Sequence, residues 1–178
     1  VANSAAGDVA AGVESNGANS AHQYELLKQD LAAQDPGYVP RSNGPEGFTQ
    51  LRNSLQTTTN QALADLTADP ELARGLMSPG SYDHLVNGTN LAPASFGKAV
   101  ERLTARYVRS DPLLTSQFEY LSKPFVSTPD FVGTLGDNAF TFDITTDASV
   151  ASHLTRPYGP TTTYITYPGL PPGLVFPQ

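Results

Sequence analysis

Three acidic residues in the second half of the chain have a spacing that could bring their carboxylates together. Glu101 lies in a run with helical periodicity, Pro129-Asp130 opens a short β-rich run, and Asp143 lies inside the next β-rich run. Two carboxylates on adjacent strands and a third from a packed helix can hold a divalent cation, and hard oxygen ligands suit Mg²⁺ or Mn²⁺. Such an ion polarises a phosphoryl oxygen and lowers the pKa of an attacking water, which is the chemistry of phosphodiester hydrolysis.

Asp143 is the most informative of the three acids. It lies within the segment FTFDITT, and an acid without a partner is costly to bury in an apolar strand. Strand alternation places it on the same face as Thr141 and Thr145. Each acid also has an ordinary structural explanation, namely a turn or strand start at Asp130, a solvated strand face for Asp143 and a solvated helix face for Glu101.

A second group of residues could act without a metal. His153 and Arg156 follow the acidic strand, and the Thr- and Tyr-rich run TTTYITY comes after them. Metal-independent ribonucleases use these residue types for acid–base work and for stabilising developing negative charge. The bland alternatives are a capping or surface histidine and a strand rich in residues that favour strands.

Basic residues gather on the helix that carries Glu101. Arg102, Arg106 and Arg109 fall at i, i+4 and i+7, and Lys98 precedes them, so that four of the ten basic residues occupy twelve positions. This spacing makes one stripe along a helix. The stripe is either a solvated helix face or a ridge that contacts phosphates.

The elements that must position these residues follow from hydrophobic periodicity. Apolar residues from Phe96 to Tyr107 recur at helical spacing, and Asp111-Pro112 should end that helix. Gly136-Asp137-Asn138 has hairpin turn chemistry. The expected elements are a helix at 96–110, a helix end or first strand at 118–125, strands at 130–135 and 140–145, a helix at 147–156 and a strand at 161–167, before a Pro-rich tail without regular structure.

The N-terminal half should be mostly helical. Residues 1–20 have almost nothing to bury and are interpreted as linker or weak helix. Together with the later elements, this predicts an α+β fold in which a mixed sheet of about four strands is flanked by helices. We expect an accessory region at 1–85 and a catalytic domain at 88–178. The N-terminal elements expected are helices at 22–33, 48–66 and 70–75, a loop at 36–47 and turns over 78–95.

Composition limits the possible function classes. The chain has no cysteine, which excludes disulfides, thiolate metal sites and cysteine nucleophiles. Its net charge of −7 argues against a nucleic-acid ligand, but ten of the seventeen acidic residues precede residue 85 and the remainder is close to neutral. No run approaches the ~20 apolar residues of a membrane helix, so we expect no stable membrane insertion. Since the chain begins with Val1, we expect it to be part of a longer protein.

The segment TPDFVGTLGDNAFTFDITT resembles the PD-(D/E)xK nucleases, whose fold is restriction-endonuclease-like. Asp130 matches the first acid of their motif, Asp143 the second, and Glu101 the glutamate that many members carry on a helix. The resemblance implies that these three hold Mg²⁺ or Mn²⁺. Thr145 stands where the family has its catalytic lysine, so a basic residue must come from elsewhere. The candidates for that role are Lys98, Lys123, His153 and Arg156.

The segment VESN, within an Ala-, Gly- and Asn-rich stretch, is similar to the VENN boundary that precedes the toxins of contact-dependent growth inhibition and related polymorphic toxins. This resemblance implies a protein secreted by one bacterium and delivered to the cytoplasm of another, with residues 1–85 assisting its uptake. It also implies a cognate immunity protein. The function expected is metal-dependent cleavage of DNA or tRNA. The alternatives are a metal-independent ribonuclease using His153 and Arg156, and a non-catalytic binding module. The candidate catalytic residues are Glu101, Asp130, Asp143, Thr145, His153 and Arg156.

Overall fold

The computed structural model describes residues 45–121 and 128–178. The chain divides into two compact units, Val1–Thr49 and Gln50–Gln178. All the described strands, and all the described helices apart from the first turn of α2, lie in the second unit. The linker and helix predicted over residues 1–33 lie outside the described residues, as does Lys123. The division of function at residues 85–88 remains a prediction.

Helix α2 (Pro45–Ala68) contains the helix expected at 48–66 and begins earlier, so residues 45–47 are helical rather than part of a loop. Leu55, Ala62 and Leu66 are fully buried, and their spacing places them on one face. The run of threonines at 57–59 does not interrupt the helix. Thr58 and Thr59 donate their hydroxyls to the carbonyls four residues earlier, each over 2.9 Å, which gives both side chains a partner inside the helix.

The turns predicted over 78–95 are wrong for most of that range. After η1 (Pro70–Leu76), helix α3 (Pro79–Val86) follows the N-cap Ser78, and α4 (Ala92–Ser110) begins before Phe96. Both helices have a proline in their first turn, where its missing N–H needs no partner. Pro112 acts in the same way, because Asp111 ends α4 and caps the short helix α5 (Pro112–Gln117).

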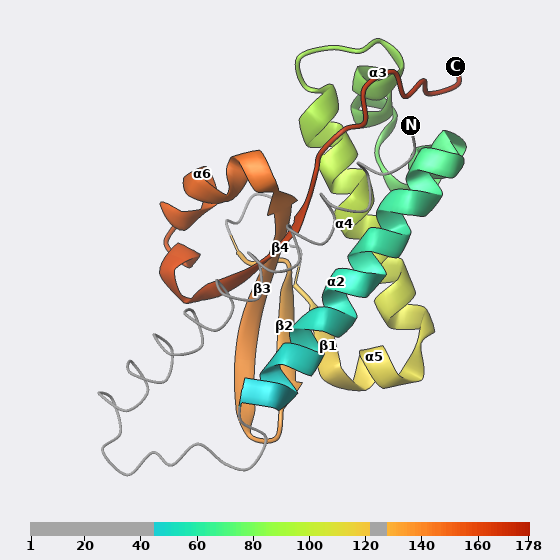
Figure 1. Ribbon diagram of the computed structural model, residues 1–178. Helices are drawn as coiled ribbons and strands as arrows, with labels where there is room; N and C mark the ends of the chain where they lie inside the picture. Colours follow the sequence, from blue (N-terminus) through green and yellow to red (C-terminus); the bar gives the residue numbers. More distant parts are fainter. Residues whose placement is uncertain (1–44, 122–127) are drawn as a thin grey trace, which may run out of the picture. The chain divides into compact units, whose positions relative to one another are not determined.

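The sheet confirms the predicted α+β fold, a mixed sheet flanked by helices (Figure 1). β1 (Phe118–Tyr120), β2 (Phe131–Leu135) and β3 (Asn138–Thr146) pair antiparallel, and β4 (Thr162–Tyr167) pairs with β3 in parallel. The predicted hairpin joins β2 to β3, with Gly136 at φ 59°. The parallel β4 requires a crossover, which consists of η2 (Asp147–Ser149), α6 (Val150–Leu154) and η3 (Gly159–Thr161).

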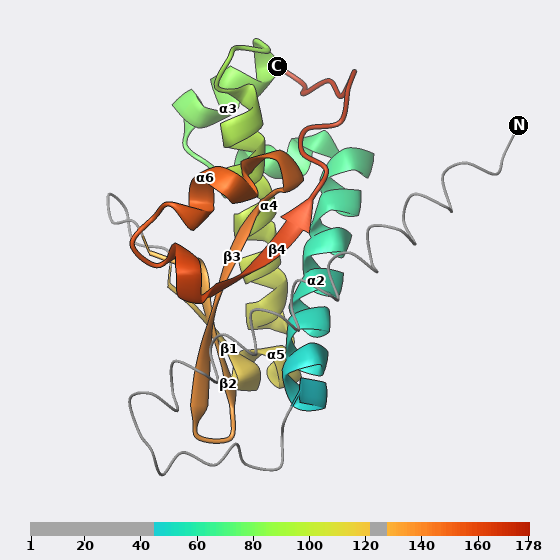
Figure 2. The same ribbon diagram turned by 60° about the vertical axis from the view of Figure 1, so that its left-hand side comes forward.

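Helices cover both faces of this sheet. α2 and α4 lie on one side, and α6 with its flanking turns lies on the other (Figure 1 and Figure 2). Phe118, Phe131 and Phe142 form an aromatic cluster in the core, with ring centroids 5.7–6.5 Å apart around Phe118. Gly133 leaves room for this cluster, because a Cβ there would lie 2.7 Å from the Phe142 ring. The cluster therefore packs strands β1, β2 and β3 together.

The Pro-rich tail has no regular structure, as the sequence predicts, but it is not loose. Phe176 is 4% exposed and makes edge contacts with Tyr82 and Phe96. The Tyr82 hydroxyl donates to the carbonyl of Pro177 over 2.9 Å. The tail therefore joins α3 to α4 and helps to fix the helix that carries Glu101.

Candidate active site

A cleft of about 560 Å³ lies between the first half of α4 and the end of β3 with its crossover. Residues from five separate segments line it, so the site depends on the fold as a whole. All six residues that the sequence nominated line this one cleft: Glu101, Asp130, Asp143, Thr145, His153 and Arg156.

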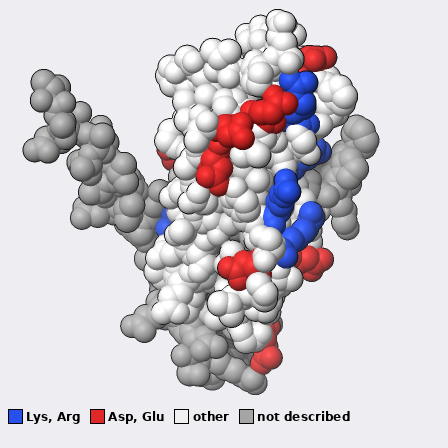
Figure 3. Space-filling model, turned by 90° about the vertical axis from the view of Figure 1, so that its right-hand side faces the viewer, with Lys and Arg blue, Asp and Glu red and all other residues white. Residues whose placement is uncertain are grey.

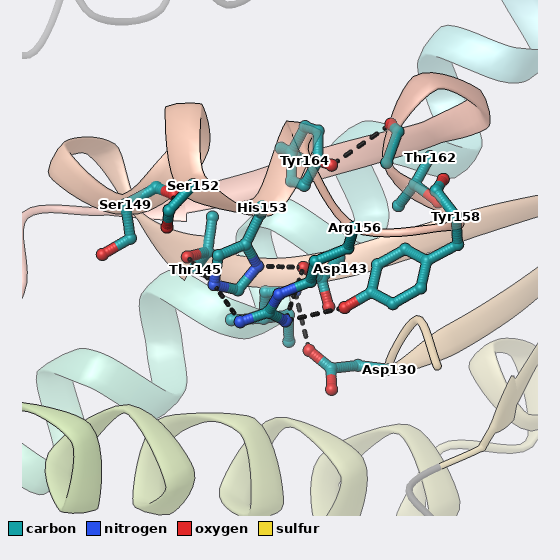
Figure 4. A network of polar contacts seen from close by, with 12 residues as sticks. Asp130, Asp143, Thr145, Ser149, Ser152, His153, Arg156, Tyr158, Thr162 and Tyr164 are labelled. Atoms are coloured by element: carbon teal, nitrogen blue, oxygen red, sulfur yellow. Dashed lines mark hydrogen bonds and ion pairs between the residues drawn. The ribbon is translucent and has the colours of Figure 1, made fainter. Parts of the chain in front are cut away.

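Asp143 and His153 form the buried centre of the cleft. Asp143 is 2% exposed, and its Oδ2 accepts a hydrogen bond from Nδ1 of His153 (Figure 4). A nitrogen of Arg156 lies 4.0 Å from the same oxygen. The buried acid thus has two cationic or hydrogen-bonding partners, both supplied by the crossover that follows β3. Its burial, which seemed costly from the sequence, is compensated.

The other imidazole nitrogen faces two further polar groups. His153 Nε2 lies 2.9 Å from Nη2 of Arg156 and 3.2 Å from Oγ1 of Thr145. A guanidinium can only donate, so Nε2 must accept, and the ring hydrogen is on Nδ1, where it is donated to Asp143. Nε2, the accepting nitrogen in this arrangement, points away from the orienting carboxylate. Imidazoles oriented in this way serve as general bases.

Arg156 and Tyr158 extend this network toward the outside of the cleft. Nη1 of Arg156 donates to the Tyr158 hydroxyl over 2.7 Å (Figure 4). The Arg156 side chain is 40% exposed, so that part of its guanidinium is accessible from the cleft. We refer to Asp143, Thr145, His153 and Arg156 as the histidine side of the cleft.

Glu101 lies across the cleft with its own partners. It is 7% exposed, and the Lys98 ammonium lies 2.8 Å from Oε1 and 2.7 Å from Oε2. The Tyr120 hydroxyl donates to Oε1 over 2.5 Å. One helical turn separates Lys98 from Glu101, so α4 supplies both charges. We refer to Lys98, Glu101 and Tyr120 as the helix side.

Asp130 lies between the two sides. Its Oδ2 accepts a hydrogen bond from the backbone N–H of Ile144 over 2.8 Å, which fixes it against β3 (Figure 4). Burial of the carboxyl and the negative charges of Glu101 and Asp143 raise the pKa of Asp130 well above its usual value. Burial and the charges of Glu101 and Asp130 likewise raise the pKa of Tyr167. The cleft therefore concentrates negative charge around Asp130.

The donor chemistry of Asp130 and Asp143 fits a divalent cation. Within the described residues no hydrogen bond reaches Oδ1 of either acid, and an adjacent cation would offset the repulsion that raises the pKa of Asp130. Glu101, by contrast, has both oxygens bound by Lys98. In the described parts of the chain, no three His, Asp or Glu side chains are close enough to form a complete set of metal ligands.

Thr145 stands where the PD-(D/E)xK nucleases have a lysine. Its uncharged hydroxyl contacts His153. Of the basic residues proposed to replace that lysine, Lys98, His153 and Arg156 line the cleft.

Tyr158 and Tyr167 also line the cleft; neither was nominated individually from the sequence, where Tyr167 appeared only within the run TTTYITY. Tyr167 reaches it because Gly97 has no side chain, since a Cβ there would lie 2.7 Å from the Tyr167 hydroxyl. The available signal for Tyr158 was its position two residues after Arg156.

Comparison with known protein families, curated proteins and solved structures gives no significant match. Among the described helices, none has the length and apolar character needed to cross a membrane.

Proposed function

We propose that this protein hydrolyses phosphodiester bonds in nucleic acid, as the nuclease part of a secreted bacterial toxin. The observation that carries the proposal is the composition of the cleft, in which three carboxylates meet a histidine, an arginine and a lysine. Carboxylates and an oriented imidazole can accept and donate the protons that hydrolysis moves. The arginine and the lysine can balance the charge of the phosphate. DNA and tRNA are both candidate substrates.

The histidine side would perform the proton transfer. His153 Nε2 would act as the base of the site once Arg156 turns from it to the phosphate, and Asp143 holds the imidazole in its orientation and would stabilise the imidazolium that forms. Arg156 would bind a phosphate oxygen with the part of its guanidinium that is exposed. Removal of a proton from the attacking water and stabilisation of the developing charge would thus come from one short stretch of chain.

Asp130 and Asp143 would hold a Mg²⁺ or Mn²⁺ ion, with Glu101 as the neighbouring acid from α4. Such an ion would polarise a phosphoryl oxygen and lower the pKa of the attacking water. Lys98 would hold Glu101 in place, because its ammonium contacts both carboxylate oxygens.

A metal-independent ribonuclease is the second candidate. The specific observation in its favour is the position of His153 Nε2, which lies within hydrogen-bond distance of both Thr145 and Arg156. In this case the substrate 2′-hydroxyl would give its proton to His153 and bond to phosphorus, and Arg156 would stabilise the charge on the phosphate oxygens. The bond from phosphorus to the 5′-oxygen would break, leaving a 2′,3′-cyclic phosphate, and the 5′-oxygen would take the proton from His153.

Cleavage of tRNA, single-stranded DNA and duplex DNA by the purified chain tests these proposals, with Mg²⁺, with Mn²⁺ and with EDTA. We expect cleavage that EDTA abolishes and either ion restores. Cleavage of RNA that persists in EDTA would instead support the second candidate. Asp147→Asn is the matched control for variants of Asp143, because Asp147 is exposed and only four residues away. The third alternative, a non-catalytic binding module, survives only if no nucleic acid is cleaved in any condition.

The toxin assignment also requires a cognate immunity protein that covers the catalytic cleft. We expect the protein encoded beside this chain to bind residues 88–178 and to inhibit cleavage. Binding that survives deletion of 88–178 would contradict this assignment.

A further inference from the structure

Helix α4 carries an uneven share of the positive charge. Of the seven Lys and Arg residues in the described ranges, four lie on this helix. Arg102, Arg106 and Arg109 are all exposed. On the face shown in Figure 3, Lys and Arg side chains form one column, and acidic side chains lie beside it. We call Arg102, Arg106 and Arg109 the arginine ridge.

Among the residues that the structure describes, no acid is neutralised by the ridge. Within the described residues, ion pairs involve Arg74, Lys98, His153 and Arg156, and none involves a ridge arginine. Arg102 donates to the carbonyl of Leu76 over 2.6 Å, which holds its guanidinium in place with donors to spare. An arginine row that the fold neither pairs nor buries is available to an anionic partner.

The ridge is continuous with the cleft. Lys98 lies on the same side of α4 as Arg102 and Arg109, and it lines the cleft. The guanidinium of Arg109 lies 5.2 Å from the centre of the Tyr120 ring, and the hydroxyl of that tyrosine contacts Glu101 inside the cleft. At a rise of about 1.5 Å per residue, Lys98 and Arg109 are about 16 Å apart along the helix axis. This length corresponds to about five nucleotides at 3.4 Å of rise per strand.

We infer that the arginine ridge binds the phosphate backbone of a nucleic-acid strand and leads it to the cleft. This inference rests on the proposed function, because it supplies the substrate path of that site. A chain with a net charge of −7 repels nucleic acid at long range, so binding needs a local row of cations. A row spaced along one helix and ending at a catalytic cleft matches a linear polyanion better than it matches a compact acidic protein.

Salt dependence of binding tests the ridge directly. The probe is a fluorescein-labelled phosphorothioate oligonucleotide, measured by anisotropy against wild type, Arg106→Gln and the triple variant Arg102→Gln/Arg106→Gln/Arg109→Gln. Each lost phosphate contact should make the slope of log K against log salt shallower by about one. Arg106→Gln should fold like wild type, because the described chain gives that side chain no hydrogen bond or ion pair. The single variant therefore still tests the ridge if the triple variant misfolds. Arg74→Gln is the matched control, since Arg74 is paired with Glu71.

Hydrolysis of a small diester, bis(p-nitrophenyl) phosphate, is measured in parallel, because such a substrate cannot reach the ridge. We expect unchanged diester hydrolysis and weaker, less salt-dependent oligonucleotide binding in both ridge variants. An unchanged slope in the folded triple variant would overturn the inference. Unchanged oligonucleotide binding with lost inhibition by the immunity protein would overturn it too, and would assign the ridge to a protein partner. A further outcome is that wild type cleaves neither diester nor nucleic acid while the ridge variants still bind the oligonucleotide more weakly. That result would contradict the proposed hydrolysis and support the role of the ridge in binding.

Discussion

The two sides of the cleft hold similar charges in different ways. On the helix side, Lys98 and Tyr120 donate hydrogen bonds to the Glu101 carboxylate, so that this group already has its partners within the fold. On the histidine side, Asp143 orients His153, and the ring keeps an accepting nitrogen and a partly exposed Arg156 directed at the cleft. The difference suggests a division in which the histidine side reacts and the helix side holds the structure.

The largest effect should come from the histidine side. His153→Gln should lower cleavage by about 10²–10⁴-fold, because the variant loses the general base. Its melting temperature should stay close to that of wild type, since His153 is a partly exposed crossover residue. Steady-state cleavage and thermal unfolding of the same preparation give both values. A large loss of stability with cleavage retained would assign His153 to the structural role and reverse the comparison.

The helix side should respond in the opposite way. Lys98→Met leaves the Glu101 carboxylate, whose side chain is 9% exposed, without its cation, and should lower the free energy of unfolding by about 1–3 kcal/mol. The double variant Lys98→Met/Glu101→Gln should recover most of that loss, because the uncompensated charge is gone. Urea unfolding of the two variants measures this. If the double variant is no more stable than the single one, charge compensation is not what Lys98 provides.

A smaller effect is expected from Asp130, and its sign is set by the raised pKa. The folded protein binds this proton more tightly than the unfolded chain, whose Asp pKa is about 3.9. Asp130 therefore lowers stability as pH rises from about 4 through its folded-state pKa. Asp130→Asn should flatten the melting temperature against pH over that window and raise it at neutral pH. A variant profile parallel to that of wild type would show that the crowding of acids around Asp130 is absent.

The sequence predicts the candidate site well because the relevant rules are local. Alternation along β3 places Asp143 and Thr145 on one face, the Gly136 turn aligns β2 with β3, and a short helix then returns His153 to the strand it follows. These relations depend on residues close together in the chain. They were sufficient to bring together Asp143, Thr145 and His153, which line the cleft.

What the sequence does not predict depends on tertiary contacts. Tyr167 enters the cleft because β4 runs parallel to β3, with Tyr167 beside Thr146, and because Gly97 makes room on α4. The pairing of Glu101 with Tyr120 joins residues whose contact depends on helix α5, which connects α4 to β1. The helix α3 lies where the sequence predicts turns, and Pro79 occupies its first turn.

The most direct test of the central claim is Asp143→Ala, measured for nucleic-acid cleavage and melting temperature together. Asp143 orients the base and is the shared acid of both proposed mechanisms, so its loss should abolish cleavage. The melting temperature should be unchanged or higher, because residues of active sites commonly lower stability for the sake of function. Full cleavage activity in a stably folded Asp143→Ala protein would contradict the account.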